Sequence, residues 1–275
     1  MEARSVQIQA TEEKRFKPNI NYKKIGVSLL VILAFFVMWS VTVKVISSAY
    51  LPTPEGSFRA VGELVINGDF DGYSIGDHIW ASLLRVLAGF CGGVIMGIVL
   101  GMLMGIYPSI YRTMKIIIEP IRFIPPIAWI PMAIVLLSGF SRYVFLIWFG
   151  AFFPVFISVI ASIPKVDPIL KDVVKVYGGN WFDIVKKIVI PSVTPEILAG
   201  MRIGLGECWM CIVAAEMVGG ESAGLGRLIL KYADRLLINE VVVGMLIIGI
   251  IGLICNEAVL RLEKKLFKWR TEITI

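Results

Sequence analysis

Four ionisable side chains lie within long apolar stretches of the sequence, namely Arg85, Arg202, Glu207 and Glu216. Moving such a group into lipid costs at least about 2.5–3.5 kcal/mol, so each needs a partner or a function. Glu207 lies near the middle of its stretch, and with its neighbours Trp209 and Met210 it is a candidate to line a solute pathway or a gate. Alternatively, Glu207 pairs with Arg202 or Arg85 and fixes the register of neighbouring helices. The sequence leaves both interpretations open for Glu207.

For the other three ionisable residues the sequence favours a structural role. Arg202 and Glu216 lie close enough to the ends of their stretch for their side chains to reach interfacial water. For Arg85 we expect an ion pair that holds helices together.

The sequence lacks the short motifs of enzymatic chemistry. It contains no Gly-x-x-x-x-Gly-Lys-[Ser/Thr] loop that would hold nucleotide phosphates, and no HExxH, GxSxG or paired CxxC motif. Cys208 and Cys211 form a single CxxC inside an apolar stretch, where two small apolar residues are the favoured interpretation. We therefore expect a chain that is not an enzyme and that carries no metal and no cofactor of its own.

The composition indicates a membrane protein. Of the 275 residues 57% are hydrophobic and only 17% are charged, and the charged residues cluster between apolar runs. Basic loops on the cytoplasmic side explain the net charge of +6 without nucleic-acid binding. A helix needs about 20 apolar residues to cross a bilayer. Six runs approach or exceed this length, at 25–46, 77–106, 123–139, 142–162, 195–218 and 240–260.

The sequence thus predicts an all-α polytopic membrane protein with six transmembrane helices. Pro125, Pro126 and Pro131 should kink the third of these. We expect Thr194 to cap the fifth span and Pro195 to occupy its first turn. The connections 47–76, 107–122 and 219–238 are interpreted as loops or turns.

Five glycines recur at every fourth residue of the second span: Gly89, Gly93, Gly97, Gly101 and Gly105. The period of a helix places them along one ridge, where a neighbouring helix can approach closely. This spacing predicts a packing surface.

The charged segment 165–196, between the fourth and fifth spans, carries an apolar stripe at helical spacing: Val166, Ile169, Leu170, Val173, Val174 and Tyr177. Each such side chain, once buried, contributes roughly 1.5–3 kcal/mol relative to exposure, so the stripe should not remain in water. Part of it can pack on the protein's own helices, and we expect the rest to dock on a partner protein.

This segment should fold as two helices. Gly178 and Gly179 break the first one, because glycine tolerates the backbone angles of a helix C-terminus. Asn180 caps the second helix with Asp183 as its capping-box partner, and Pro191 is expected to end it.

Charge asymmetry predicts the orientation. Nineteen lysines and arginines lie in the N-terminal tail, the 107–122 turn, the 163–190 segment and the C-terminal tail, against five in the opposite loops. The positive-inside rule then places both termini and the 165–196 segment in the cytoplasm.

The segment from Asp172 through Gly178, with Pro191 following thirteen residues later, resembles the cytoplasmic "EAA" loop of binding-protein-dependent ABC transporter permeases. The chain has Asp-Val-Val in place of Glu-Ala-Ala and ends in IVIP at 188–191. SLLRVLAGF at 82–90, PPIAWIP at 125–131, FGAFFP at 149–154, AAEM at 214–217 and GLG at 224–226 are similar to the nitrate/sulfonate/taurine branch of that family. The resemblance covers about 77–262.

The resemblance implies the type I ABC importer fold in a prokaryotic cell (inner) membrane, with coupling helices between the fourth and fifth spans. It implies a coupling loop that includes Asp172, Val173, Val174, Tyr177, Gly178, Gly179, Trp181 and Pro191. The implied partners are a second permease subunit (a homodimer is expected and a heterodimer left open), two cytoplasmic ATP-binding cassette subunits that hold ATP and Mg, and an extracytoplasmic solute-binding protein. The implied solute is a small anion such as an alkanesulfonate, taurine or nitrate.

The expected organisation starts with a cytoplasmic tail (1–24), a first transmembrane helix (25–46) and an extracytoplasmic loop (47–76). A five-helix core (77–262), which contains the coupling segment 165–196, and a second cytoplasmic tail (263–275) follow. The rival interpretation is a stand-alone proton-coupled carrier that protonates Glu207 in each cycle.

Overall fold

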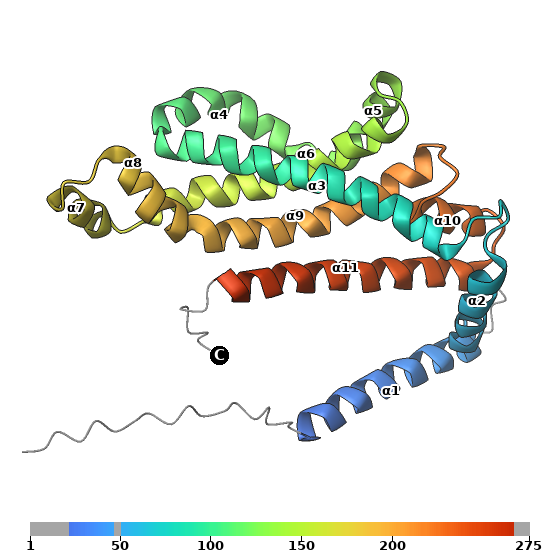
Figure 1. Cartoon of the computed structure of the whole chain (residues 1–275). Helices are drawn as coiled ribbons and strands as arrows, with labels where there is room; N and C mark the ends of the chain where they lie inside the picture. The colour runs from blue at the N-terminus through green and yellow to red at the C-terminus, as the bar shows by residue number, and fades with distance from the viewer. Residues whose placement is uncertain (1–21, 47–50, 267–275) are drawn as a thin grey trace, which may run out of the picture. The chain divides into compact units, whose positions relative to one another are not determined.

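The computed structural model describes residues 22–46 and 51–266, and this part of the chain is helical without strands. The expectations for the N-terminal tail 1–21 and for 267–275 lie outside the described residues. The helices are α1 (Tyr22–Ile46), α2 (Pro54–Asn67), α3 (Ile75–Ile106), α4 (Pro108–Phe123), α5 (Ile130–Leu136), α6 (Phe140–Ser162), α7 (Pro168–Val176), α8 (Trp181–Ile184), α9 (Ile190–Val218), α10 (Leu225–Ala233) and α11 (Ile238–Leu266), with short 3₁₀ or π turns at η1 (Pro126–Trp129), η2 (Ile163–Lys165) and η3 (Val185–Val189) (Figure 1).

The chain divides into two compact units, Met1–Ala49 and Tyr50–Ile275. The first contains α1, an apolar helix of membrane-spanning length. The hydroxyls of Ser40 and Thr42 donate to carbonyls one turn back, those of Phe36 and Met38, so neither hydroxyl is left unsatisfied in a lipid environment.

In the second unit, α3 packs against α6 through its glycine ridge. A Cβ added at Gly93 would lie 2.7 Å from the carbonyl oxygen of Trp148, and one at Gly97 would lie 3.0 Å from that of Phe152. Each step of four residues on α3 matches a step of four on α6, so the two helices run parallel. The missing side chains let the two backbones approach closely.

The third helix of this core, α9, runs antiparallel to α6. Gly204 of α9 lies against Ala151 of α6, and Gly200, one turn earlier, lies against Ser158 and the carbonyl oxygen of Pro154. α11 follows α9 and runs antiparallel to it: Arg202, in the first half of α9, pairs with Glu263 near the end of α11. Figure 1 shows α3, α6, α9 and α11 along one direction, with α7 and α8 at one end and α2 and α10 at the other.

The predicted third span is not one helix, and the prediction of a turn at 107–122 was wrong. The chain there forms α4, then breaks at the two prolines and bends by 88° into η1 and α5. Ile124 is extended, as the residue before a proline prefers, and neither Pro125 nor Pro126 offers an N–H to continue a helix. Because α3 and α6 run parallel, the chain between them must return across the bilayer, and this bent pair provides the return.

Among the described residues five helices are long and apolar enough to cross a membrane, or six with the bent pair as one span. The predicted all-α polytopic fold is confirmed. The expected loops at 47–76 and 219–238 contain the helices α2 and α10.

The fifth span begins earlier than expected. α8 continues through the π turn η3 into α9 without a break, so Pro191 does not end the second coupling helix. Pro191 lacks an N–H, and the preceding turn is wider, with the N–H of Ile190 donating to the carbonyl of Val185. Thr194 does not act as a cap, because its hydroxyl donates to the Ile190 carbonyl at 2.6 Å within the helix. Pro195 lies inside α9.

Candidate solute pathway and coupling surface

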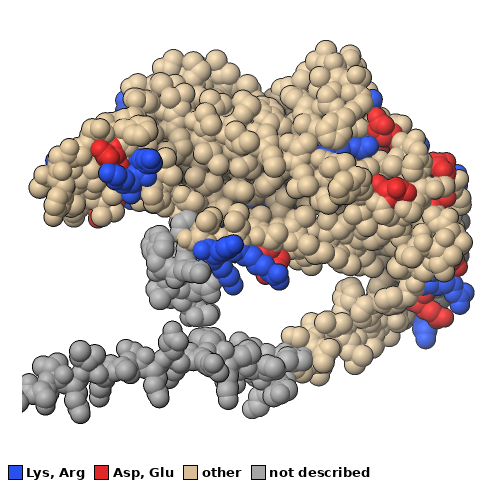
Figure 2. Space-filling view, viewed as in Figure 1, with Lys and Arg blue, Asp and Glu red and all other residues tan. Residues whose placement is uncertain are grey.

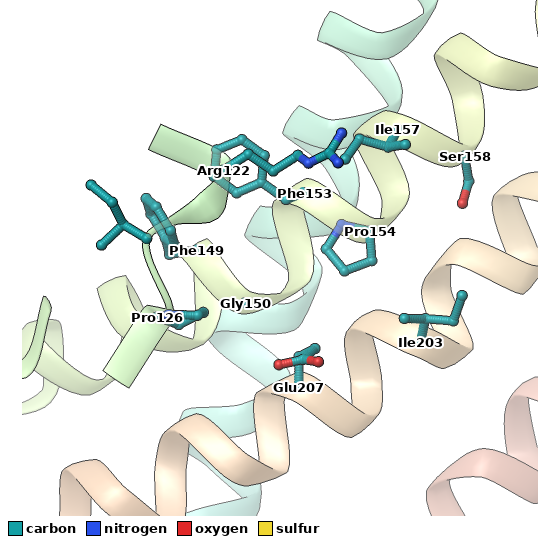
Figure 3. Close-up of a pocket in the computed structure, with 11 residues that line it drawn as sticks. Arg122, Pro126, Phe149, Gly150, Phe153, Pro154, Ile157, Ser158, Ile203 and Glu207 are labelled. Carbon is teal, nitrogen blue, oxygen red and sulfur yellow. The ribbon is translucent and has the colours of Figure 1, made fainter. Parts of the chain in front are cut away.

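A cavity of about 370 Å³ opens between the end of α4, the middle of α6 and α9. Figure 3 shows Glu207 projecting into it from α9 and Arg122 reaching it from α4, with side chains of α6 between them. The other lining residues are Ile124, Pro126, Phe149, Gly150, Phe153, Pro154, Ile157, Ser158 and Ile203. The wall is therefore mainly apolar, with one carboxylate, one guanidinium and one hydroxyl.

Close helix packing fixes the position of Glu207. A Cβ added at Gly150 would lie 3.0 Å from the sulfur of Cys211 and 3.6 Å from the Cβ of Glu207, so α6 and α9 touch directly beside the carboxylate. Pro154 within α6 removes one backbone donor next to the cavity.

Glu207 makes no hydrogen bond or ion pair with any residue that the structure describes. The partners suggested for it are engaged elsewhere: Arg202 pairs with Glu263 at 3.3 Å, and Arg85 pairs with Glu216 at 2.6 Å. Its neighbours in sequence lie on other faces of α9. Trp209 is buried and lines, with Arg202, a second cavity between α9 and α11, whereas Met210 is exposed.

Sequence reasoning missed a buried polar network at the opposite end of the molecule from α7. The Glu216 side chain is fully buried, contrary to the expectation that it reaches interfacial water. It accepts hydrogen bonds from Ser82, at 2.8 Å, and from the N–H of Gly226, at 2.9 Å, in addition to the ion pair with Arg85. All of these partners stabilise the charged form of a carboxylate that is shielded from water.

A second buried cluster lies beside the first. The carboxylate of Asp69 contacts Lys231 at 2.6 Å and His78 at 3.1 Å, and all three side chains are nearly inaccessible to solvent. Burial opposes ionisation of Asp69, but hydrogen bonds from Lys231 and from the N–H groups of Tyr73 and Asp71 outweigh it and hold the pKa of Asp69 below its ordinary value. His78 is the single histidine of the sequence, and nothing in the sequence marks Asp69 or Lys231 as its partner. No group of three or more His, Cys, Asp or Glu side chains suited to a metal ion occurs among the described residues.

The coupling segment protrudes at the end of the bundle next to the C-terminal end of α3 (Figure 1). Asp167 caps α7, and the chain turns at Gly178, whose φ of 77° favours glycine. Asn180 and Asp183 form the predicted capping box. The ring of Trp181 lies against that of Tyr107 at the α3–α4 junction, with the centroids 5.9 Å apart and the planes tilted by 30°.

The apolar stripe of this segment divides into a buried part and an exposed part. Val166 is buried and Val174 packs against the core. The remaining large side chains stay open to solvent: Ile169, Leu170, Val173, Val176, Tyr177, Trp181 and Phe182. Asp172 forms a surface ion pair with Lys175 at 2.9 Å.

Comparison with known families identifies residues 93–269 as a binding-protein-dependent transport system inner membrane component. A putative ABC transporter permease protein of Methanocaldococcus jannaschii is 37% identical, over 72% of this chain and 74% of that protein. The putative aliphatic sulfonates transport permease protein SsuC of Bacillus subtilis is 32% identical, over 88% and 87%. The nitrate import permease protein NrtB of Synechocystis is 31% identical, over 78% and 79%.

Among solved structures, the inward-facing MetNI methionine ABC transporter matches with a TM-score of 0.50 and 20% identity, over 66% of this chain and 94% of the other. This similarity shows the fold of a type I ABC importer permease. The relatives are permease proteins, the membrane part of a transporter, so the stand-alone carrier is not favoured. The chain belongs to the family of binding-protein-dependent ABC importer permeases, in its nitrate/sulfonate/taurine branch.

Proposed function

We propose that this permease subunit forms the pathway for a small anion, of the alkanesulfonate, taurine or nitrate type, and couples its passage to ATP hydrolysis by a separate subunit. The observation that carries the proposal is the exposed apolar surface of α7 and α8 on a segment continuous with α9. Seven large apolar side chains there are between 44% and 87% exposed. Their burial against another protein would contribute roughly 1.5–3 kcal/mol per side chain.

The proposed partners are a second permease subunit, with a homodimer favoured, two cytoplasmic ATPase subunits that hold ATP and Mg, and an extracytoplasmic solute-binding protein. The roles of Asp172, Tyr177 and Gly178 in ATPase docking, and of Glu207 in the pathway, are part of this proposal.

We propose that both termini and α7 face the cytoplasm. The charge distribution supports this orientation. Figure 2 shows basic side chains with acidic ones beside them near α8 and near the C-terminal end of α11, and several acidic side chains, with some basic ones, over the end that carries α10. Basic residues are retained on the cytoplasmic side.

The continuity of α8, η3 and α9 supports a mechanism. We call the two helices α7 and α8, with the turn at Gly178 between them, the elbow. When ATP binding draws the two ATPase subunits together, each subunit would displace the elbow to which it is bound. A helix transmits that displacement along its axis, and the 38-residue segment Trp181–Val218 carries it to Glu207 and the cavity. Such coupling requires a segment with two conformations whose relative populations are shifted both by the nucleotide and by the solute.

Replacement of Gly178 tests the proposal. No atom lies within 4 Å of a Cβ at this position, so a valine side chain would meet no steric clash. However, the φ of Gly178 is 77°, a backbone conformation that valine rarely adopts, so Gly178→Val strains the backbone of the turn. In the reconstituted transporter we expect Gly178→Val to lower solute uptake and solute-stimulated ATP hydrolysis at least about fivefold, the lower bound of typical coupling energies.

Gly178→Asn is the matched control, because asparagine tolerates the left-handed conformation, and it should retain most of both rates. Unchanged rates in Gly178→Val, with normal insertion, would refute the coupling role.

A further inference from the structure

The open question at the cavity is what stabilises the Glu207 carboxylate. It lies near the middle of α9, is partly buried, and has no polar partner among the described residues. An intramembrane carboxylate without a protein partner marks a site for a ligand that supplies the missing charge.

Among the described residues, Arg122 is the one cationic group that lines the same cavity. No ion pair joins Arg122 to Glu207. Its guanidinium lies 3.8 Å from Glu119 at the edge of an ion-pair contact, and it stacks on the ring of Phe123 at 5.0 Å. It makes no hydrogen bond within the described chain, so its fork of N–H donors is available to an acidic group.

The space between the two charges suits a short, flexible organic solute. Phe149, Phe153 and Pro154 form apolar wall between them, and Ser158 adds a hydroxyl (Figure 3). The cavity of about 370 Å³ is many times the roughly 10–15 Å³ that one water molecule needs, so a small organic solute fits in it.

We propose that this cavity binds a zwitterion, with its ammonium group on Glu207 and its sulfonate or other acidic group on Arg122. The inference rests on the proposed function and narrows the class of solute from small anions in general to zwitterions. A simple anion such as nitrate or an alkanesulfonate would leave Glu207 unpaired and would be repelled by it, whereas an aminoalkanesulfonate satisfies both charges at once.

The test is ligand binding to the purified permease–ATPase complex in detergent, without the solute-binding protein, so that the binding protein's own selectivity does not contribute. The probes are 2-aminoethanesulfonate and ethanesulfonate, which differ in the amine. We expect wild type to bind the amine-bearing probe at least about tenfold more tightly, a ratio that corresponds to about 1.4 kcal/mol.

Glu207→Gln should abolish that ratio, chiefly by weakening the binding of 2-aminoethanesulfonate. Arg122→Gln should weaken both probes. Glu257→Gln is the matched control, because Glu257 is an exposed carboxylate on α11 that pairs with Arg261 away from the cavity, and it should leave the ratio unchanged.

Equal binding of the two probes by wild type, or an unchanged ratio in Glu207→Gln, would overturn the proposal. So would a Glu207→Gln variant that loses only its association with a second copy, since Glu207 would then serve the subunit interface. Failure of the proposed function would show separately, as a permease that does not retain an ATPase on purification.

Discussion

At the scale of single residues, the connection between α9 and α10 is held by an unbroken set of side chains. Lys231 donates to the carbonyl of Ser222, Arg85 to that of Ala223, and Glu216 accepts from the N–H of Gly226. Between these, His78 contacts the backbone of Gly224 and Ser82 accepts from the N–H of Leu225. A fully satisfied buried network is costly to rearrange, and we call this network the anchor.

The Asp69–Lys231 pair makes the anchor sensitive to acid. The depressed pKa of Asp69 means that its stabilising contribution is complete above its ordinary pKa near 3.8 and is lost as the pH falls through the lower native value. Asp69→Asn leaves Lys231 with Asp71, which is about half exposed, as its remaining acidic partner, and should lower the free energy of unfolding by up to about 3 kcal/mol at neutral pH. Thermal unfolding in detergent between about pH 3 and about pH 7 measures the stability difference between wild type and Asp69→Asn. This stability difference should become smaller only toward pH 3.

Asp234→Asn is the control for that series, since Asp234 is exposed and has no ionic partner in the described chain. A difference between wild type and Asp69→Asn that is constant over the whole pH range would contradict the assignment.

At the scale of elements, the glycine ridge of α3 determines how closely α6 can approach. Gly92 and Gly93 are neighbours on the same helix, but a Cβ at Gly93 would lie 2.7 Å from both the Cβ of Ala151 and the Trp148 carbonyl, while one at Gly92 has only an ordinary contact at 3.4 Å. Gly93→Ala should therefore destabilise the protein by about 1–3 kcal/mol, because the helices must separate. Gly92→Ala should be neutral or stabilising by up to about 1 kcal/mol, because alanine favours helix.

Unfolding of the two variants in parallel measures both changes in stability. Equal effects would show that the α3–α6 contact is looser than the structure indicates. The stretch that contains both residues is otherwise apolar and membrane-spanning, so the comparison isolates the packing surface.

The elements that the sequence predicted well are those that local chemistry determines. The Asn180–Asp183 capping box and the turn at Gly178 follow from side-chain hydrogen bonding and from backbone freedom within a few residues. The prediction that Pro191 ends the second helix was wrong, because a proline is compatible either with the end of a helix or with a wider turn inside one. Only the packing of α9 on α6 and α3 decides between them.

The sequence predicted only part of the candidate site, because some of its residues meet only in the folded protein. Glu207 stands out in the sequence by its charge and depth, but its neighbour Arg122 lies 85 positions away, in what looked like a surface turn. Periodicity within one segment carries no information on which segments meet in space. An ion pair was expected for Arg85, but its partner Glu216 was not identified, and the Asp69 cluster was missed, because the interacting residues come from separate helices and connections.

At the scale of the whole molecule, helix directions constrain the topology. α3 and α6 run parallel, α9 opposes α6 and α11 opposes α9, so the bent pair α4–α5 must cross once between α3 and α6. Five crossings in the second unit then put α2 and α7 on opposite sides of the membrane. α9 and α11 cross twice after α7, so the C-terminal end of α11 lies on the side of α7.

Single cysteines on a background without native cysteines test this arrangement. Glu63→Cys marks α2 and Tyr177→Cys marks the elbow; both positions are exposed, and Tyr177 is 87% accessible. A membrane-impermeant maleimide added to intact cells should label the α2 cysteine, and should label the elbow cysteine only after permeabilisation. If both cysteines react from outside, the bent pair does not cross the membrane and the chain returns on the side from which it entered. If only the elbow reacts from outside, the orientation is inverted, and no cytoplasmic ATPase can reach the apolar surface of α7.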